Sequence, residues 1–368
     1  MEGRGHIVHE KAQTLPPPVM SVGIARWLKD NLFSSPSNVV LTFVVIYVLW
    51  LIVPPFLDWA IFDAVWYATS RAECWDTGDG ACWAVVVTRF DQFVYGDYPV
   101  SERWRANLAF VLLFVALAPV LFDGIPWRRH LVGFSIAYPV VAYILLIGGF
   151  GLPEVETARF GGFLLTIVIG ITGISASLPL GILLALGRQS DLFIIRVLCV
   201  AFIEFIRGVP LITLLFVAST LLNYFMPPGT SFNLLVRVLI MVTLFSAAYL
   251  AEVIRGGLQA MPAGQYEAAK SLGLPYWKTM RLVILPQALK ISIPGIVNSF
   301  IALYKDTTLV IIIGLLDPLG IGKATLSDTT WQGLSTEVYV FVAIFFFLCC
   351  FGMSRYSAWL ERRLHTGH

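Results

Sequence analysis

Two opposite charges stand close together in a stretch of the sequence that is otherwise strongly apolar. Glu204 and Arg207 lie three residues apart in the run Glu204-Phe205-Ile206-Arg207-Gly208-Val209-Pro210, so a helix would place both on one face. Ionisable groups inside membrane spans are costly unless they are paired or wetted, and they default to functional candidates. The pair could bind a zwitterion, with its carboxylate on Arg207 and its ammonium on Glu204. The alternative is a structural ion pair at a helix break near the membrane surface.

Further residues that could line a polar path lie in the same and in later apolar segments. Gly208 and Pro210 would interrupt a helix, and backbone groups freed at such breaks can bind ligands within a membrane. Thr213, Ser246 and Asn298 could supply neutral hydrogen bonds. Each of these three side chains alone is more often a helix-packing residue, so the sequence leaves their role open.

A polar cluster directly follows a later apolar run. It consists of Lys305, Asp306, Thr307 and Thr308, and on the topology derived below it faces the outside. It could gate the outer mouth of a path through the membrane or contact another protein. The simpler alternative is a solvated helix end.

Composition makes the chain a membrane protein. Of its 368 residues, 58% are hydrophobic and 13% are charged, whereas soluble globular domains carry about 25% charged residues. Several apolar runs reach the roughly 18 residues that suggest a membrane span. The net charge of +2 gives no reason to expect a nucleic-acid partner. We therefore expect an all-α polytopic membrane protein.

About eight transmembrane helices are expected. The predicted spans cover residues 39–57, 108–122, 131–150, 160–186, 191–225, 234–254, 282–306 and 338–359. The fifth is too long for one straight span and contains the Glu204–Pro210 interruption, so we expect a kinked or broken helix there. The short apolar segment 307–316 is either a re-entrant element or the outer end of the seventh helix.

The charges along the chain favour one orientation. Residues 1–38 lack an apolar signal core directly after the initiator, so we expect a retained cytoplasmic tail. With eight spans both termini are cytoplasmic, and 16 Lys and Arg residues then lie inside against 7 outside. This excess agrees with the positive-inside rule.

A long acidic loop, residues 58–106, follows the first span and would then be periplasmic. It holds Cys74 and Cys82 on either side of a Gly/Asp-rich turn. A disulfide between them is plausible in that oxidising compartment, and two free thiols are the alternative. The other three cysteines sit in apolar runs and are most simply packing residues.

A polar, helix-forming segment separates the sixth and seventh spans. Pro262 suits the first turn of a helix, Gly273 suits the position just past a helix end, and Pro275 cannot continue the helix. We expect a helix of about three turns over residues 262–273. The residues that would form its slim, approachable apolar stripe are Ala268, Ala269 and Leu272.

This segment resembles the glutamate–alanine–alanine…glycine signature of ABC importer permeases. The matching residues are Gln265, Tyr266, Glu267, Ala268, Ala269, Leu272 and Gly273, followed by Val283-Ile284-Leu285-Pro286, with Val283 where isoleucine is usual. In that family the segment is a cytoplasmic coupling helix that docks into a groove on the ATPase. An ordinary surface helix between two spans is the alternative.

The last five spans, residues 156–368, resemble the type I core of the polar amino-acid uptake class of these permeases. The matching strings are Phe163–Thr166, Pro179–Gly181, Glu204–Leu211 and Tyr304–Leu309. The extension of three helices over residues 39–155, with its loop 58–106, resembles the M-type permease subunits of general L-amino-acid transporters of Gram-negative bacteria.

The resemblance implies an inner-membrane permease subunit of an ATP-driven L-amino-acid importer. It implies as partners a homologous permease subunit, two ATPase subunits, a periplasmic amino-acid-binding protein, membrane lipid and the amino-acid substrate. ATP and Mg²⁺ would then be held by the ATPase, with no cofactor in this chain. The cluster Lys305–Thr308 would gate the outer mouth or meet the binding protein.

Enzyme chemistry is not expected in this chain. The run Gly320-Ile321-Gly322-Lys323-Ala324-Thr325 lacks the first glycine of a phosphate loop and the Ser/Thr directly after lysine. The five histidines fall in tails or a loop, and no metal-ligand cluster is visible. Energy must therefore come from a partner or an ion gradient, so the alternative function is an ion-coupled secondary amino-acid transporter.

Overall fold

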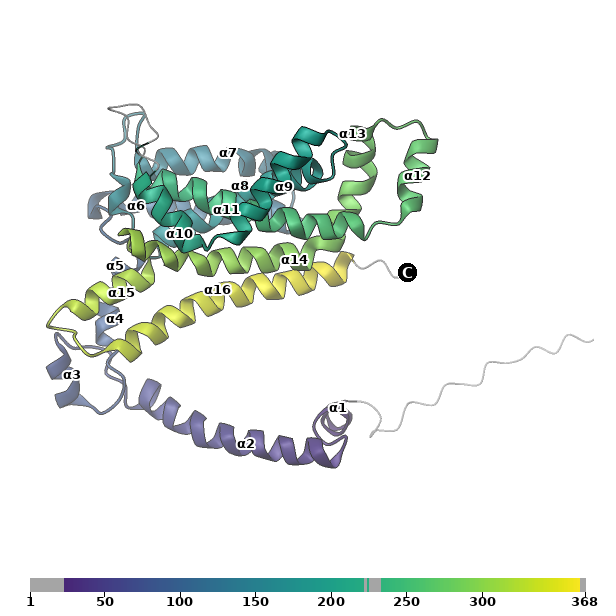
Figure 1. Cartoon of the computed structure of the whole chain (residues 1–368). Coiled ribbons are helices and arrows are strands. Elements are labelled where there is room, and N and C mark those ends of the chain that lie inside the picture. Colours follow the sequence, from purple (N-terminus) through teal and green to yellow (C-terminus); the bar gives the residue numbers. More distant parts are fainter. Residues whose placement is uncertain (1–22, 222–223, 225–232, 365–368) are drawn as a thin grey trace, which may run out of the picture. The chain divides into compact units, whose positions relative to one another are not determined.

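The computed structural model describes residues 23–221, 224 and 233–364, and these residues are organised in helices (Figure 1). Within them, β structure is limited to the isolated bridges Gly96–Phe160 and Gly149–Leu152. The described residues form two compact units, one of residues 23–65 and 77–81 and the other of residues 66–76, 82–221, 224 and 233–364. We describe each unit by itself.

The first unit contains a short helix and one apolar helix. They are α1 (Ile24–Asn31) and α2 (Pro36–Leu57), and α2 continues as a π-helical turn, Asp58–Phe62. The Ser35 hydroxyl caps α2 by accepting the Asn38 N–H at 3.2 Å. Thr42 is the buried residue of α2, whose apolar side chains otherwise lie exposed all round. A helix that is apolar on every side is suited to lipid, which agrees with the predicted first span.

The second unit contains the remaining helices. In chain order these are α3 (Arg71–Thr77), α4 (Ala84–Thr88), α5 (Phe90–Tyr95), α6 (Arg103–Leu121), α7 (Arg128–Ile147), α8 (Gly162–Arg188), α9 (Phe193–Gly208), α10 (Leu211–Phe216), α11 (Leu234–Gln259), α12 (Ala263–Ser271), α13 (Tyr276–Thr279), α14 (Leu285–Asp306), α15 (Pro318–Ser327) and α16 (Ser335–Leu364). The extension predicted over residues 39–155 is thus divided, with α2 in the first unit and α6 and α7 in the second.

Length and hydropathy confirm the polytopic class. Among the described residues, seven helices can cross a membrane, or up to eight if a bent pair forms one span. The seventh predicted span is longer than expected, because α13, a π-helical turn, α14 and the 3₁₀ helix Thr307–Ile313 form one segment, Tyr276–Ile313. The segment 307–316 therefore begins as the continuation of that helix, one of the two predicted alternatives.

The bent pair is the predicted broken helix. Residues Phe193–Gly208 and Leu211–Leu221 are bent by 103°. Pro210 disfavours helical geometry at the residue before it, and Val209 is accordingly extended, with φ −109° and ψ 131°. Pro210 then occupies the N-cap of α10. The break predicted from Gly208 and Pro210 is confirmed.

The α6–α7 hairpin is joined at one end by a buried arginine. Arg105 is fully buried and donates to the carbonyls of Leu145, at 2.6 Å, and Pro153, at 2.9 Å. It also pairs with Glu102 at 3.0 Å. The last carbonyls of a helix lack partners within the helix, so Arg105 compensates the end of α7. This pairing lets α6 begin at Arg103, five residues before the predicted start of the second span at 108.

Glycines let α8 pack closely on its neighbours. A Cβ at Gly181 would lie 2.8 Å from Leu250 of α11, and one at Gly173 would lie 3.0 Å from Leu303 of α14. Small residues permit such approach between membrane helices. The buried face formed by α8, α11 and α14 thereby becomes the core of the unit.

Asp317 caps α15. This helix contains the run Gly320–Thr325, which the sequence analysis distinguished from a phosphate loop. The Asp317 carboxylate accepts the N–H groups of Gly320 at 2.9 Å and Leu319 at 3.2 Å. The residue is fully buried, and this burial raises the pKa of the carboxyl from 3.8 to about 6. Gly320 and Lys323 are therefore part of an ordinary capped helix.

This raised pKa predicts a pH-dependent stability. The folded state binds a proton at Asp317 more tightly than the unfolded chain does, so stability falls as pH rises from about 4 to about 6, by up to about 3 kcal/mol. Asp317→Asn keeps a cap acceptor but cannot ionise, and should remove this trend. Thermal unfolding of the purified protein between pH 4 and 7 measures it, and an unchanged pH slope in the variant would contradict the assignment.

Candidate functional site

Five charged side chains from three helices meet, and one of these helices is α9, the first half of the broken helix. Arg188 ends α8, Glu204 and Arg207 lie in the last turns of α9, and Glu252 and Arg255 lie on α11. Arg188 reaches Glu204 at 2.8 Å and Glu252 at 3.2 Å. Arg255 Nε donates to Glu252 at 2.7 Å. Three arginines against two glutamates leave this charge cluster with one excess positive charge.

Glu252 is the centre of the charge cluster. Its carboxylate faces Arg188, Arg207 and Arg255, and its side chain is 21% exposed. A carboxylate at this depth in a span is stabilised by such guanidinium partners. The sequence prediction did not include Arg188, Glu252 or Arg255 in the site. The i, i+3 spacing of Glu252 and Arg255, which matches that of Glu204 and Arg207, was the available indication.

The two residues predicted to pair with each other have other partners. Glu204 bonds Arg188, whereas the carboxylate nearest to Arg207 is that of Glu252, at 3.9 Å. The pairing predicted within α9 is therefore replaced by contacts between helices, from Glu204 to α8 and from Arg207 to α11. Arg207 also lies over the Tyr249 ring, 5.6 Å from its centroid.

Arg207 has the weakest carboxylate contact of the three arginines in the charge cluster. Its ion-pair distance of 3.9 Å is longer than a hydrogen bond, and its side chain is 34% exposed. A guanidinium is a bidentate donor well suited to a carboxylate. The excess positive charge of the cluster is thus available at Arg207 for an anionic group of a ligand.

The other residues predicted to line the polar path differ in their exposure. Gly208, Thr213 and Asn298 are exposed on the second unit, and a Cβ at Gly208 would meet open space. Ser246 is only 3% exposed, and its hydroxyl has no hydrogen-bond partner among the described residues. The structure therefore places Ser246 inside the helix packing, away from the exposed members of the set.

The polar segment between α11 and α14 is helical, as predicted, in α12 (Ala263–Ser271). Pro262 lies one residue before the helix, at its N-cap, and its carbonyl accepts the Gln265 N–H at 3.1 Å. Gly273 has φ +70°, and the bonds from its N–H to Lys270 and from the Leu274 N–H to Ala269 form a Schellman cap. The end of the helix predicted from Gly273 is thus confirmed by its backbone geometry.

The exposed face of α12 differs from the predicted stripe. Ala269 is only 2% exposed because it faces its own chain, so the prediction that a partner could approach it is wrong. Ala268 and Glu267 are exposed, and Leu272 is 78% exposed. The sequence identified the small residues but not the rotation of the helix, which is set by packing.

Contacts join α12 to both neighbouring long helices. Tyr266 packs against an apolar cluster that includes Met261, Met280 and Ile284, and Gln287 Nε2 donates to Gln265 Oε1 at 3.1 Å. Because α11 ends at Gln259, Arg255 and Glu252 of the charge cluster lie about 6 Å and about 10 Å from the end of that helix. A displacement of α12 would therefore act on the start of α14 and on the end of α11, which carries Glu252 and Arg255 of the charge cluster.

The predicted outer cluster is only partly available to a partner. Thr307 is 1% exposed and donates to the Tyr304 carbonyl at 2.8 Å, while Thr308 donates to the Lys305 carbonyl at 3.0 Å. These hydroxyls stabilise the transition from α14 to the 3₁₀ helix. Lys305 is exposed, and Asp306 and Thr308 are half-buried, so these three members, unlike Thr307, are accessible to another molecule.

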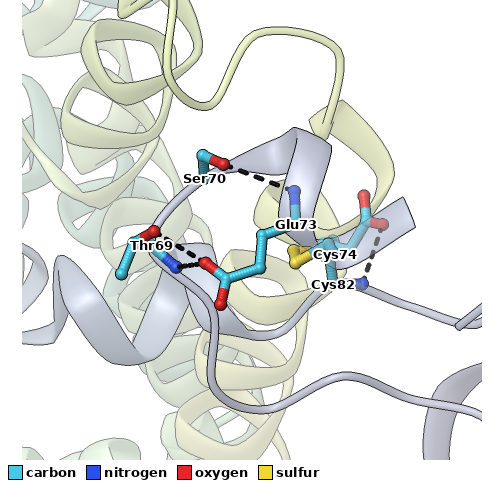
Figure 2. Close-up of a disulfide and its surroundings, with 6 residues drawn as sticks. Thr69, Ser70, Glu73, Cys74 and Cys82 are labelled. Atoms are coloured by element: carbon cyan, nitrogen blue, oxygen red, sulfur yellow. Dashed lines mark hydrogen bonds between the residues drawn. A yellow bond between two sulfur atoms is a disulfide. The ribbon is translucent and has the colours of Figure 1, made fainter. Parts of the chain in front are cut away.

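A disulfide joins α3 to the segment before α4 (Figure 2). The helix α3 lies at the end of the second unit opposite α12 (Figure 1). Cys74 and Cys82 are bonded, with their Cα atoms 5.8 Å apart, and both are 1% exposed. Figure 2 shows Glu73 accepting from the N–H and hydroxyl of Thr69. The Cys82 N–H donates to Glu337 of α16 at 3.2 Å. The loop containing the two cysteines is thereby attached to the helical core.

Metal chemistry receives no support within the described part of the chain, where no group of three or more His, Cys, Asp or Glu residues could hold an ion.

Comparison with known proteins finds extensive similarity. Residues 177–366 match the family described as binding-protein-dependent transport system inner membrane component. The chain is 49% identical to a glutamate/glutamine/aspartate/asparagine transport system permease protein of Rhodobacter capsulatus, over 96% of each protein. It is 52% identical to an inner membrane amino-acid ABC transporter permease protein of Escherichia coli K12, over 96% of this chain and 97% of that protein.

Among solved structures, one described as an amino acid ABC transporter with histidines is 31% identical to the chain. The similarity covers 54% of this chain and 91% of that one, with a TM-score of 0.48.

The position of Glu252 predicts unequal effects of removing the two carboxylates. Glu252→Gln leaves three guanidiniums without their shared counter-charge and should lower stability by about 2 kcal/mol. Glu204→Gln is the matched control, because Glu204 has one ion-pair partner, is 54% exposed and should contribute under about 1 kcal/mol. Thermal unfolding in one detergent compares them, and equal losses would argue against a central role for Glu252.

Proposed function

The chain belongs to the family of binding-protein-dependent transport system inner membrane components, and we propose that it forms part of the path by which an ABC importer takes L-amino acids into the cell. Two relatives that match over nearly their whole length carry this proposal, since both are named as amino-acid permeases. The excess positive charge exposed at Arg207 suits the carboxylate of such a substrate. The relatives lend no support to the ion-coupled alternative.

The chain is a transport subunit rather than an enzyme, and as an ABC permease it works with an ATPase and a binding protein. We propose the finer composition of one homologous permease subunit, two ATPase subunits and a periplasmic amino-acid-binding protein. ATP and Mg²⁺ are then bound by the ATPase subunits, and this chain needs no cofactor of its own. The run Gly320–Thr325 lies in the capped helix α15, which supports the proposal that ATP is bound by the ATPase subunits.

Coupling is proposed to pass through α12. A loaded binding protein docks outside, and ATP draws the two ATPase subunits together inside. The exposed residues Glu267, Ala268 and Leu272 meet the ATPase, and the displaced α12 moves α11 through their short connection. Movement of Glu252 with α11 changes the contact between Glu252 and Arg207, and the path for the amino acid opens. Hydrolysis and reset release the substrate to the cytoplasm.

Reversing a charge on the exposed face of α12 should uncouple the importer. Glu267→Lys is expected to reduce amino-acid uptake at least tenfold without unfolding the chain, because Glu267 lies on the surface. Gly273→Val should act similarly, since a β-branched residue is strained at φ +70°. Uptake and substrate-stimulated ATPase activity of the reconstituted importer measure both effects.

Glu154→Lys is the matched control for charge reversal, because Glu154 is also exposed but lies in the loop between α7 and α8. It should transport normally. Co-purification with the second permease subunit shows that each variant is assembled. Full uptake with normal ATPase stimulation in the Glu267→Lys importer would overturn the proposed role of α12.

The proposed orientation places α12 and both termini in the cytoplasm, supported by the excess of Lys and Arg on that side. Lys270 of α12 is exposed and should react with a membrane-impermeant amine reagent in inverted vesicles, but not in intact cells stripped of their outer membrane. Lys305, proposed to lie outside, should give the opposite pattern after mass-spectrometric mapping. Reaction of Lys270 from the outside would exclude contact with a cytoplasmic ATPase.

A further inference from the structure

A cavity of about 420 Å³ lies between two helix pairs of the second unit. One wall comes from the hairpin of α6 and α7, and the other comes from α8 and α11. Small side chains make room for it in both walls, namely Ala109 on α6, Ala142 on α7 and Ala176 on α8. The residues of the charge cluster and of the predicted polar path do not line this cavity.

The cavity is lined almost entirely by apolar side chains. Typical members are Leu113, Leu146 and Ile171. The Tyr138 hydroxyl in its wall already donates to the Ala109 carbonyl at 2.9 Å, and the Thr157 hydroxyl bonds the Asn233 side chain. These two hydroxyls are thus engaged within the protein. Three further hydroxyl-bearing residues, Tyr143, Thr172 and Ser175, also line the cavity, and the rest of the lining is apolar.

The length of the cavity matches one leaflet of a bilayer. The lining residues of α8 extend from Leu164 to Ala176, a rise of about 18 Å, and half of a hydrocarbon core is about 15 Å. All four helices of the walls are membrane spans. Tyr143, at 59% exposed, and the exposed Thr172 also line the cavity, so it opens to the surface between α7 and α8.

The apolar chemistry of the lining argues against water and against a free amino acid as the occupant of the cavity. Apolar cavities stay dry unless polar partners hold the water, and a zwitterionic amino acid would lose its hydration without gaining charged partners. An empty cavity would forfeit the dispersion contacts of its lining side chains. A hydrocarbon chain of lipid supplies these contacts along the apolar part of the lining.

We propose that the cavity is a binding site for one acyl chain of a membrane phospholipid, which fills the space between the α6–α7 hairpin and the α8–α11 pair. The lipid headgroup lies at the membrane surface, outside the cavity. This site is separate from the amino-acid path, and the proposal does not depend on the nature of the transported substrate.

Photo-crosslinking tests this site directly. The full-length protein is reconstituted in vesicles with a phosphatidylethanolamine that carries a diazirine within one acyl chain. Irradiation should label Leu146, Leu164 and Leu235, which line the cavity but are at most 6% exposed. Because these side chains are shielded from the surface, lipid that merely surrounds the protein does not reach them. Mass-spectrometric mapping quantifies the labelled peptides.

Ala142→Phe should fill the cavity from α7 and reduce this internal labelling at least fivefold. Ala137→Phe is the matched control, because Ala137 lies on the same helix, is exposed and does not line the cavity. If Ala142→Phe fails to accumulate, Ala176→Phe fills the space from α8 instead. Equal labelling in the filled variant and its control would overturn the proposal.

Two competitors distinguish the occupant. An excess of unlabelled phospholipid should reduce internal labelling, whereas soluble amino acids should not. Protection by an amino acid would show that the cavity belongs to the transport path and would overturn the proposal. A free fatty acid with the same diazirine should label these residues less than the phospholipid does, and stronger labelling would exclude a phospholipid chain as the occupant.

Discussion

The low polarity of the membrane makes one carboxylate, that of Glu252, the interaction on which the arrangement of the charged helices depends. Arginines entering a span must find a counter-charge or water. Glu252 supplies that charge to Arg188, Arg207 and Arg255 and thus joins the end of α8, the last turns of α9 and the body of α11. The first half of the broken helix, α9, can end among these charges because its charged side chains have partners on α8 and α11.

Local chain chemistry made the breaks and ends of helices predictable. Pro210 forced an extended residue before it, and Gly273 supplied the positive φ that closes α12. These effects act within a few residues, so they can be recognised without knowledge of the tertiary structure. The membrane spans were predictable for a similar reason, since their hydropathy is a property of continuous sequence.

Contacts between helices were not predictable in the same way. The partner of Glu204 is Arg188, sixteen residues away, and the choice depends on the relative rotation of α8 and α9. The burial of Ala269 likewise depends on which side of α12 faces α11 and α14. Arg105 shows the same limit, because its acceptor Leu145 lies in the last turn of α7 and its acceptor Pro153 lies in the loop after that helix. Hydropathy alone could therefore not place the start of α6.

The two sides of α8 differ in how closely they pack against neighbouring helices. Gly173 and Gly181 bring its backbone into close contact with α14 and α11, and close-packed surfaces transmit displacement. Val168 and Ile171 on the other side line the cavity, where the proposed acyl chain would separate α8 from the hairpin. A flexible hydrocarbon chain can change shape without breaking specific contacts. This arrangement would allow α8, α11 and α14 to move together during the proposed coupling without displacing α6 and α7.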